Sequence, residues 1–230
     1  GLAGNLRQLS RVAHSLRDRL SADNWRTLNR LTQDGAFDRD PGLLEALGWV
    51  DRAITGLVTL SGYAFDGMTR DTGWRFLSIG RRIERLSFIC QALETALHEG
   101  RDAGLSWLLE LTDSSITYRS RYLSSPEWLP VLDLIVMDDA NPRALHFLAD
   151  GVLDFLRKLQ ARFGPCGGDE LATALAALEA LEPGRDLHPD SARLASALAQ
   201  LRQATFEVSD RLTARFFGQA VAMSQTPFSP

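Results

Sequence analysis

Apolar residues recur three or four positions apart along almost the whole sequence, and no segment alternates apolar and polar residues as a strand would. The first such stretch runs through Leu6, Leu9, Val12, Ala13, Leu16 and Leu20. Short connections between consecutive amphipathic helices favour antiparallel neighbours. The sequence therefore predicts an all-α fold, a single antiparallel multi-helix bundle of about eight or nine helices.

Capping residues, prolines and glycines mark where helices begin and end. After the first helix, the predicted starts are Ser21, Pro41, about Thr72, Leu105, Pro126, Pro142, the Gly164–Gly168 turn and Ser191. The predicted ends are about Ala64 for the third helix, His98 for the fourth, Leu123 for the fifth and about Phe217 for the last. We expect residues 1–222 to form one domain and residues 223–230 to be a disordered tail.

Composition narrows the class of protein. The 230 residues suffice for one well-buried core, and 45% hydrophobic with 23% charged residues is ordinary for a globular protein. A net charge of -4 argues against a nucleic-acid partner. No apolar run reaches transmembrane length and no signal peptide is visible, so we expect no membrane association and a cytoplasmic location. Cys90 and Cys166 have neither metal-ligand nor redox spacing, and we expect no disulfide between them.

The segment from Asp66 to Arg85 carries five arginines and one glutamate on an otherwise apolar helix: Arg70, Arg75, Arg81, Arg82, Arg85 and Glu84. On a helical wheel, one apolar stripe consists of Phe76, Ile79, Ile83, Leu86, Cys90, Leu93 and Leu97. A second stripe consists of Leu77, Arg81, Glu84 and Phe88. A helix with two apolar faces is normally central, so this pattern predicts that Arg81 and Glu84 are buried.

Two interpretations of these charges remain open. Arg81 and Arg85 flank Glu84 within one turn, which leaves a surplus positive charge that needs a carboxylate or phosphate. The charges can form an internal ion-pair network that fixes helix register, or they can bind an anionic ligand. Either way, we expect Glu84→Ala to destabilise the bundle by several kcal/mol, because it strands buried guanidinium groups.

The segment from Asp113 to Tyr122 offers further candidates. On one continuous helix, Asp113, Thr117 and Arg121 would share a face. This face can be a plain hydrogen-bonding surface, or Arg119 or Arg121 can supplement Arg81 and Arg85 around an acidic ligand such as a peptide carboxylate.

We expect neither a metal site nor a nucleotide site in this chain. The four histidines are scattered, and no Glu-x-x-His or His-Glu-x-x-His pair is present. Asp138-Asp139 lacks a second acidic pair and is better explained as a turn or helix cap. The sequence also lacks both glycine-rich phosphate-binding motifs, Gly-x-x-x-x-Gly-Lys and Gly-x-Gly-x-x-Gly.

Several segments, in order, resemble the bacterial alpha-E family, which is named for an alpha-helical domain with a characteristic Glu-Arg motif. They are Leu20-Ser21 with Trp25 and Leu28-Asn29-Arg-Leu31, then Thr69-Arg70, Gly73-Trp-Arg-Phe-Leu, Gly80-Arg-Arg-Ile-Glu-Arg85, Asp113 to Tyr122, Pro130-Val-Leu-Asp133 and Asn141-Pro-Arg143. Together they span about residues 6–160. An earlier motif-bearing helical segment of the family has no counterpart here, so the chain resembles the C-terminal part of the domain.

The resemblance implies partners more than chemistry. Alpha-E domains occur beside or fused to circularly permuted ATP-grasp proteins, often with transglutaminase-like and proteasome-like peptidases. We therefore expect an accessory domain that acts with an ATP-grasp ligase in a peptide-ligating or peptide-modifying system. On this expectation, ATP and Mg²⁺ bind only to the ligase, and the present chain binds no cofactor.

Three functional hypotheses follow. In the first, the domain binds an acidic or peptide substrate, or docks the ligase, through Arg81, Glu84 and Arg85, with less central contributions from Arg70, Arg75, Asp113, Arg119 and Arg121. In the second, Glu84 is the general base of an enzyme and the arginines clamp an anion. In the third, the Arg/Glu network is purely structural and the chain is an interaction scaffold, whose exposed apolar patch we would expect at Trp128–Val136.

Overall fold

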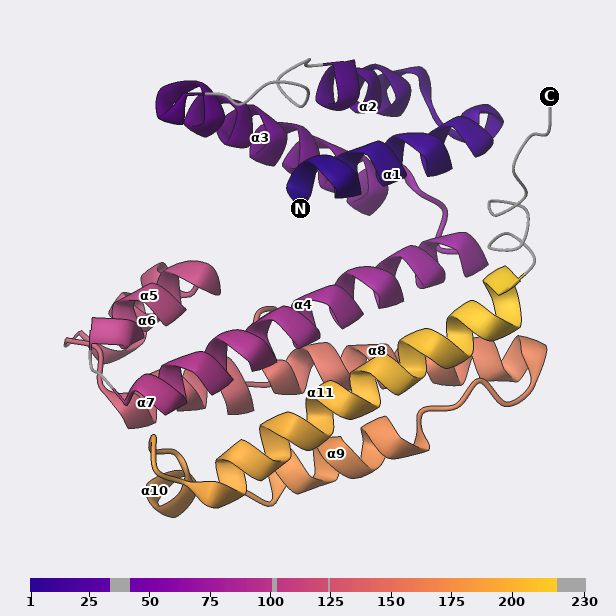
Figure 1. Cartoon of the computed structure of the whole chain (residues 1–230). Coiled ribbons are helices and arrows are strands. Elements are labelled where there is room, and N and C mark those ends of the chain that lie inside the picture. Colours follow the sequence, from indigo (N-terminus) through magenta and orange to yellow (C-terminus); the bar gives the residue numbers. More distant parts are fainter. Residues whose placement is uncertain (34–41, 101–102, 124, 219–230) are drawn as a thin grey trace. The chain divides into compact units, whose positions relative to one another are not determined.

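The computed structural model describes residues 1–33, 42–100, 103–123 and 125–218. Every regular element in these ranges is helical: there are eleven α-helices, together with short 3-10 and π turns (Figure 1). The all-α prediction is confirmed, and the expected eight or nine helices is close to this count. The predicted tail at residues 223–230 and the predicted helix start at Pro41 lie outside the described residues.

The chain divides into two compact units, residues 1–74 and residues 75–230. Two compact units can belong to one domain, so the single domain over residues 1–222 stays a prediction. Each unit is described by itself.

Unit 1 contains three helices: α1 (Leu2–Ser15), α2 (Ala22–Gln33) and α3 (Leu43–Gly67). The Ser21 hydroxyl accepts a hydrogen bond from the backbone N–H of Asn24 (3.2 Å), which confirms it as the cap of α2. The core of this unit is small. One cluster consists of Leu6, Leu31 and Ala53, with Leu9, Trp49 and Leu60 packed around them, and Ala13 and Leu28 are also buried.

Helices α2 and α3 pack closely because position 56 is a glycine. A β-carbon on Gly56 would lie 2.5 to 3.2 Å from three carbon atoms of the Leu31 side chain. Any larger residue at position 56 would have to displace Leu31, so the glycine permits this contact between the helices.

Unit 2 contains most of α4 (Thr72–Glu99) and all later helices. These are α5 (Ala103–Leu111), α6 (Ser115–Tyr122), α7 (Trp128–Leu132), α8 (Leu145–Phe163), α9 (Asp169–Glu179), α10 (Pro183–Asp186) and α11 (Ala192–Leu212). The long helices α4, α8 and α11 run alongside one another, and α9 packs against α8 and α11 (Figure 1). Helix α4 matches its predicted range almost to the residue.

The predicted helix from Leu105 to Leu123 is in fact two helices, α5 and α6. Asp113 lies between them with φ at 51°, a left-handed conformation that ends the first helix. The backbone N–H of Ser114 then donates to the carbonyl of Leu109 (2.8 Å). Asp113 therefore does not share a helix face with Thr117 and Arg121, and that prediction is wrong.

The predicted helix start at Pro142 is also wrong by three residues. Helix α8 begins at Leu145, after a turn in which the Asn141 side-chain oxygen accepts from the Arg143 N–H (3.0 Å) and the Asn141 carbonyl accepts from the Ala144 N–H (2.9 Å). Pro142 belongs to this turn. By contrast, the glycine-rich turn before α9 is confirmed, with positive φ at Gly164, Gly167 and Gly168.

The short helix α10, which the sequence analysis did not find, is held by one buried carboxylate. Asp186 accepts hydrogen bonds from the Glu182 backbone N–H (2.8 Å), from the Arg185 guanidinium (3.0 and 3.1 Å) and from Arg193 of α11 (2.7 Å). This network ties the turn before α11 to the first turn of that helix.

No helix in the described part of the chain has the length and apolar character needed to cross a membrane.

Candidate functional site

Arg81 and Glu84 are exposed on α4, contrary to the prediction that they are buried. Their stripe neighbours Leu77 and Phe88 are 41% and 48% exposed. Of the two stripes of α4, only the other one packs in the core of unit 2. Its buried members include Ile79, Ile83, Leu86, Cys90 and Leu93. Exposed charges need no buried partner, so the reason for expecting Glu84→Ala to cost several kcal/mol no longer holds.

Arg82, one position away, lies against α8. Its guanidinium carbon lies 5.0 Å from the centre of the Phe155 ring, and its Nη1 donates to the Ser78 carbonyl (3.4 Å). A β-carbon at Gly151 would be 2.7 Å from the Arg82 Nε atom. That Nε atom is buried and has no hydrogen-bond partner among the described residues. Burial lowers the pKa of Arg82, nearby Arg81 lowers it further, and Asp154 opposes the shift.

Arg85 is half-buried one turn after Arg81. Burial lowers the pKa of Arg85, and so do the guanidinium groups of Arg143, Arg81 and Arg82, in that order, while Asp113 opposes them. Among the described residues, no carboxylate lies within ion-pairing distance of Arg85. Repulsion among arginines therefore outweighs attraction to carboxylates at this position.

Arg143 and Asp113 connect two turns of the chain. The Nη2 atom of Arg143, in the turn before α8, donates to the Asp113 Oδ2 atom (3.1 Å), in the turn between α5 and α6. We call Arg81, Arg82, Arg85 and Arg143 the arginine cluster. Asp113 is one carboxylate beside it, with a side chain that is 77% exposed, and Asp154 is another, near Arg82.

Arg121 pairs with a different carboxylate. Its Nη1 atom donates to Asp138 Oδ2, while Asp138 Oδ1 accepts from the backbone N–H groups of Ala140 and Asn141 (2.8 Å each). Burial raises the pKa of Asp138, but the hydrogen bonds from Arg121, Ala140 and Asn141 together hold it below its ordinary value. Asp138 therefore forms a turn, as expected, and Arg121 stabilises this turn by pairing with its carboxylate.

The remaining candidates lie elsewhere. Arg119 donates to the Ser115 carbonyl of its own helix (3.3 Å). Arg70, in unit 1, donates to the last carbonyls of α3 and lies over the Trp74 ring at 4.4 Å. Arg75 is half-buried on α4, six residues before Arg81. Of the eight predicted residues, the structure thus groups Arg81, Arg85 and Asp113, with Glu84 on the same turn of α4.

Two members of the cluster, Arg82 and Arg143, were absent from the predicted site. Arg82 stands next to the main apolar stripe of α4, which signals partial burial against a neighbouring helix. Arg143 follows Asn141-Pro142, whose turn-forming role leaves the arginine without a local purpose. Its partner across the sequence, Asp113, is 30 residues away and could not be read from spacing.

The segment Trp128–Val136, where an exposed apolar patch was expected, exposes Leu129 (44%) but buries most of its large apolar side chains. Val131, Leu132, Leu134, Ile135 and Val136 are fully buried, because α7 and the π turn after it form part of the core of unit 2. Exposed large apolar side chains gather on α3 instead: Leu43, Leu44, Leu47, Val50, Ile54, Leu57, Val58 and Phe65.

Within the described ranges, no three His, Cys, Asp or Glu side chains lie close enough together to hold a metal ion.

Residues 1–217 match the Alpha-E family, which is described as a predicted alpha-helical domain with a conserved ER motif. Glu84-Arg85 is the only Glu-Arg dipeptide in the sequence, so the motif falls on the arginine cluster. The chain is also 31% identical, over 238 aligned positions and 93% of its length, to uncharacterized proteins of Mycobacterium tuberculosis and Mycobacterium bovis. It spans about a quarter (26%) of the length of those relatives. No solved structure matches it.

Proposed function

The chain belongs to the Alpha-E family, and we propose that it is an accessory domain acting with a circularly permuted ATP-grasp ligase in a peptide-ligating or peptide-modifying system. In this proposal its arginine cluster binds an acidic group of the substrate or of the ligase. ATP and Mg²⁺ bind to the ligase, the system is cytoplasmic, and neither nucleic acid nor a membrane takes part. The partner is proposed from the setting in which alpha-E domains occur.

The observation that supports anion binding is the charge balance of the cluster. The guanidinium groups of Arg143, Arg81 and Arg82 all lower the pKa of Arg85 and Asp113 opposes them, while at Arg82 it is Asp154 that opposes Arg81. Three of the four arginines, Arg82, Arg85 and Arg143, are partly buried, where charge interactions are screened less than in water. An added carboxylate or phosphate would relieve this repulsion, so its binding is favoured.

The shape of the guanidinium group favours ligands that carry a carboxylate or a phosphate. A guanidinium presents donors in a rigid fork that matches a carboxylate or phosphate in bidentate fashion. The buried Nε–H of Arg82 has no acceptor among the described residues, although such groups are normally hydrogen-bonded. Because this Nε atom is covered by α8 at Gly151, a ligand oxygen reaches it only if the Arg82 side chain moves.

Binding is better supported than catalysis. A general base must sit where it can reach a substrate proton while water is largely excluded. Glu84 is exposed, and it lines neither a groove between α2 and α3 nor one between α9 and α11. Nothing in its surroundings favours a role as a general base.

Docking of the ligase has separate support from α3. Eight large apolar side chains of this helix are exposed, although such residues usually avoid water when a partner is absent. A surface of this kind is typical of protein–protein contact, so docking through unit 1 is the second candidate function.

The test is isothermal titration calorimetry of the 230-residue chain against two probes. One probe is the peptide Ala-Glu-Ala, and the other is the ATP-grasp protein from the same organism. We expect both to bind, and Arg85→Met to weaken the peptide at least about tenfold, because a charge-assisted hydrogen-bond pair is lost. The matched control is Arg157→Met, since Arg157 is exposed on α8 and outside the cluster.

The two arms separate the candidates. Peptide binding that is lost in Arg85→Met but unchanged in Arg157→Met supports the acidic-substrate role. Ligase binding that is insensitive to Arg85→Met but weakened by Ile54→Ser on α3 supports docking. Binding of neither probe by the unmodified chain contradicts the proposed function.

A further inference from the structure

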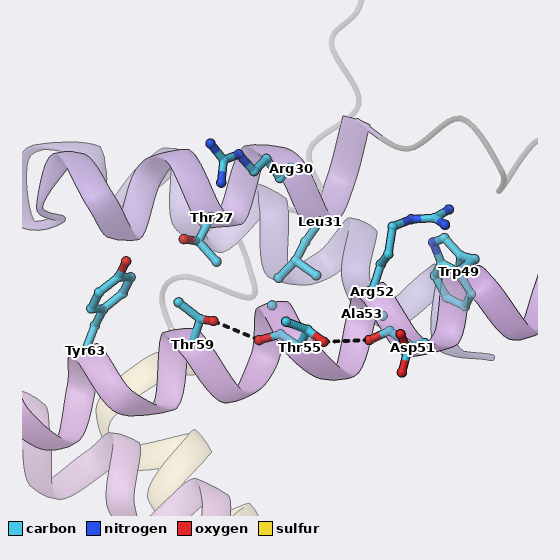
Figure 2. A pocket seen from close by; sticks show the side chains of 11 residues that line it. Thr27, Arg30, Leu31, Trp49, Asp51, Arg52, Ala53, Thr55, Thr59 and Tyr63 are labelled. Atoms are coloured by element: carbon cyan, nitrogen blue, oxygen red, sulfur yellow. Dashed lines mark hydrogen bonds between the residues drawn. The ribbon is translucent and has the colours of Figure 1, made fainter.

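Unit 1 contains a groove of about 630 Å³ between α2 and α3. This volume is within the range of small-molecule sites. Thr27 and Leu31 extend from α2 toward α3, and Thr59 and Tyr63 extend from α3 toward α2 (Figure 2). The groove therefore has side chains from both helices along its length.

The floor of the groove is apolar. Leu31 and Ala53 are 6% and 4% exposed, and Gly56 contributes no side chain beside them. Because a β-carbon at position 56 would collide with Leu31, the glycine keeps both the helix contact and the space above it. This floor suits an apolar side chain of a ligand.

The α3 wall presents hydrogen-bond acceptors. The Thr55 hydroxyl donates to the Asp51 carbonyl (3.0 Å), and the Thr59 hydroxyl donates to the Thr55 carbonyl (2.8 Å), as Figure 2 shows. A hydroxyl has one hydrogen to donate, so both oxygens keep lone pairs for a donor. These positions suit the N–H groups of a ligand.

Arginine side chains lie at the edge of the groove. Arg30 lines it from α2, beside Thr27, and is exposed. Arg52 lines it from α3. Asp51 is the carboxylate among the lining residues. The exposed guanidinium of Arg30 can pair with a negative group of a ligand.

The geometry points to a second binding site in this groove, for a short peptide with a free carboxylate. Its N–H groups would donate to Thr55 and Thr59, its apolar side chain would cover Leu31, and its carboxylate would accept from Arg30. An amino acid derivative lacking any one of these three features would leave part of the groove unmatched. The site uses residues of unit 1 alone and does not depend on the arginine cluster.

The test is a titration of the ¹⁵N-labelled 230-residue chain with N-acetyl-Ala-Leu-Ala, followed by two-dimensional NMR. We expect saturable shifts at the backbone amides of Thr27, Arg30, Thr55 and Thr59. The same peptide with an amidated C-terminus should bind at least about tenfold more weakly, because its neutral end cannot make a charge-assisted bond with Arg30. This comparison uses the unmodified chain and so does not depend on a variant that folds.

Two variants locate the contacts. Arg30→Met should weaken the acid peptide about tenfold, and Thr59→Val, which keeps the side-chain shape, should weaken both peptides severalfold. Arg26→Met is the matched control, because Arg26 lies one turn earlier on α2, is exposed and does not line the groove. Shifts that do not saturate, equal binding of acid and amide, or equal losses in Arg26→Met and Arg30→Met would each overturn the assignment.

Discussion

The Arg82 side chain crosses α8 directly over Gly151, so that a β-carbon at position 151 would lie 2.7 Å from the Arg82 Nε atom. Only a residue without a side chain allows this contact. Helix α8 therefore makes room for Arg82 because Gly151 has no β-carbon. Arg82 is held beside the Phe155 ring and half out of water as a result.

Replacing Gly151 with alanine should displace Arg82. The mid-chain atoms of Arg82, including Cδ at 3.3 Å, are too close to a new β-carbon for a small adjustment to suffice. We expect the Nε–H resonance of Arg82 to move toward the values of exposed arginines, and the affinity for Ala-Glu-Ala to fall. The stability change should be small, because the gain in helix propensity, about 1 kcal/mol, offsets the lost cation–π contact.

Gly80→Ala is the control for this substitution. Gly80 lies on α4, and a β-carbon there would meet nothing within 4 Å. The variant should be more stable by about 0.5–1 kcal/mol, from helix propensity alone. Its Arg82 resonance should not move. A shift as large as that in Gly151→Ala would refute the steric explanation.

Glu84→Ala should leave the free energy of unfolding within about 0.5 kcal/mol of the unmodified chain, as is usual for exposed positions. Leu86→Ala, two residues further along α4 and fully buried, should cost about 2–5 kcal/mol. Urea denaturation followed by circular dichroism measures both. A loss of several kcal/mol in Glu84→Ala would show that this face of α4 is covered and its charges buried.

Asp186 should make the chain sensitive to acid. The hydrogen bond from the Glu182 N–H lowers the pKa of Asp186 below 3.8, burial opposes this, and Arg185 adds to the lowering. A lowered native pKa contributes stability above the unfolded value, and that contribution is lost as pH falls through the native pKa. The melting temperature should therefore decline below about pH 4.

Asp186→Asn should melt lower at pH 7, and its melting temperature should decline less steeply below about pH 4, since the titrating group is gone. Asp190→Asn changes an exposed carboxyl four residues away and is the matched control. Parallel acid profiles for Asp186→Asn and the unmodified chain would show that the Asp186 network does not link pH to stability.

Cys90 should be unreactive in the folded chain. Burial raises the pKa of its thiol from 9.0 to about 12, Glu94 adds to this, and Arg202 opposes it. At pH 8 the thiolate fraction is then about a thousandfold below that of a free cysteine. In a Cys166→Ala background, labelling by a thiol reagent should be slow until urea unfolds the protein. Rapid labelling without urea would contradict the buried position.

Local signals in the sequence predicted much of the fold. Ser21 was recognised as a cap by residue type and Ser191 as the start of the last helix, and both hydroxyls accept a backbone hydrogen bond typical of a cap. The range of α4 followed from its periodicity and from Gly100, which has φ at 59°. These features depend on neighbours along the chain, so sequence alone contains them.

The errors arose where the outcome depended on residues far away in the sequence. The wheel of α4 shows two apolar stripes, but it cannot show that only one of them packs in unit 2. The break at Asp113 requires a left-handed conformation in a residue other than glycine, which composition does not signal. The Arg143–Asp113 pair joins two turns whose proximity is a property of the assembled helices.

The candidate site was therefore found in part. The Glu-Arg dipeptide pointed to the turn of α4 that carries Arg81, Arg82 and Arg85 of the arginine cluster, because so many cations there require an explanation. The sequence could not show whether Arg81 or Arg82 packs against α8. Adjacent residues point in different directions around a helix, so the answer depends on how α4 is rotated relative to α8.

The most direct test of the arginine cluster is an NMR titration that follows the arginine Nε–H groups of the ¹⁵N-labelled chain as Ala-Glu-Ala is added. Our account predicts saturable shifts for Arg82, Arg85 and Arg143 with one common dissociation constant, and no such shift for Arg157. Small shifts that grow linearly and equally at every arginine would mean that the cluster attracts anions without binding them, and would contradict the account.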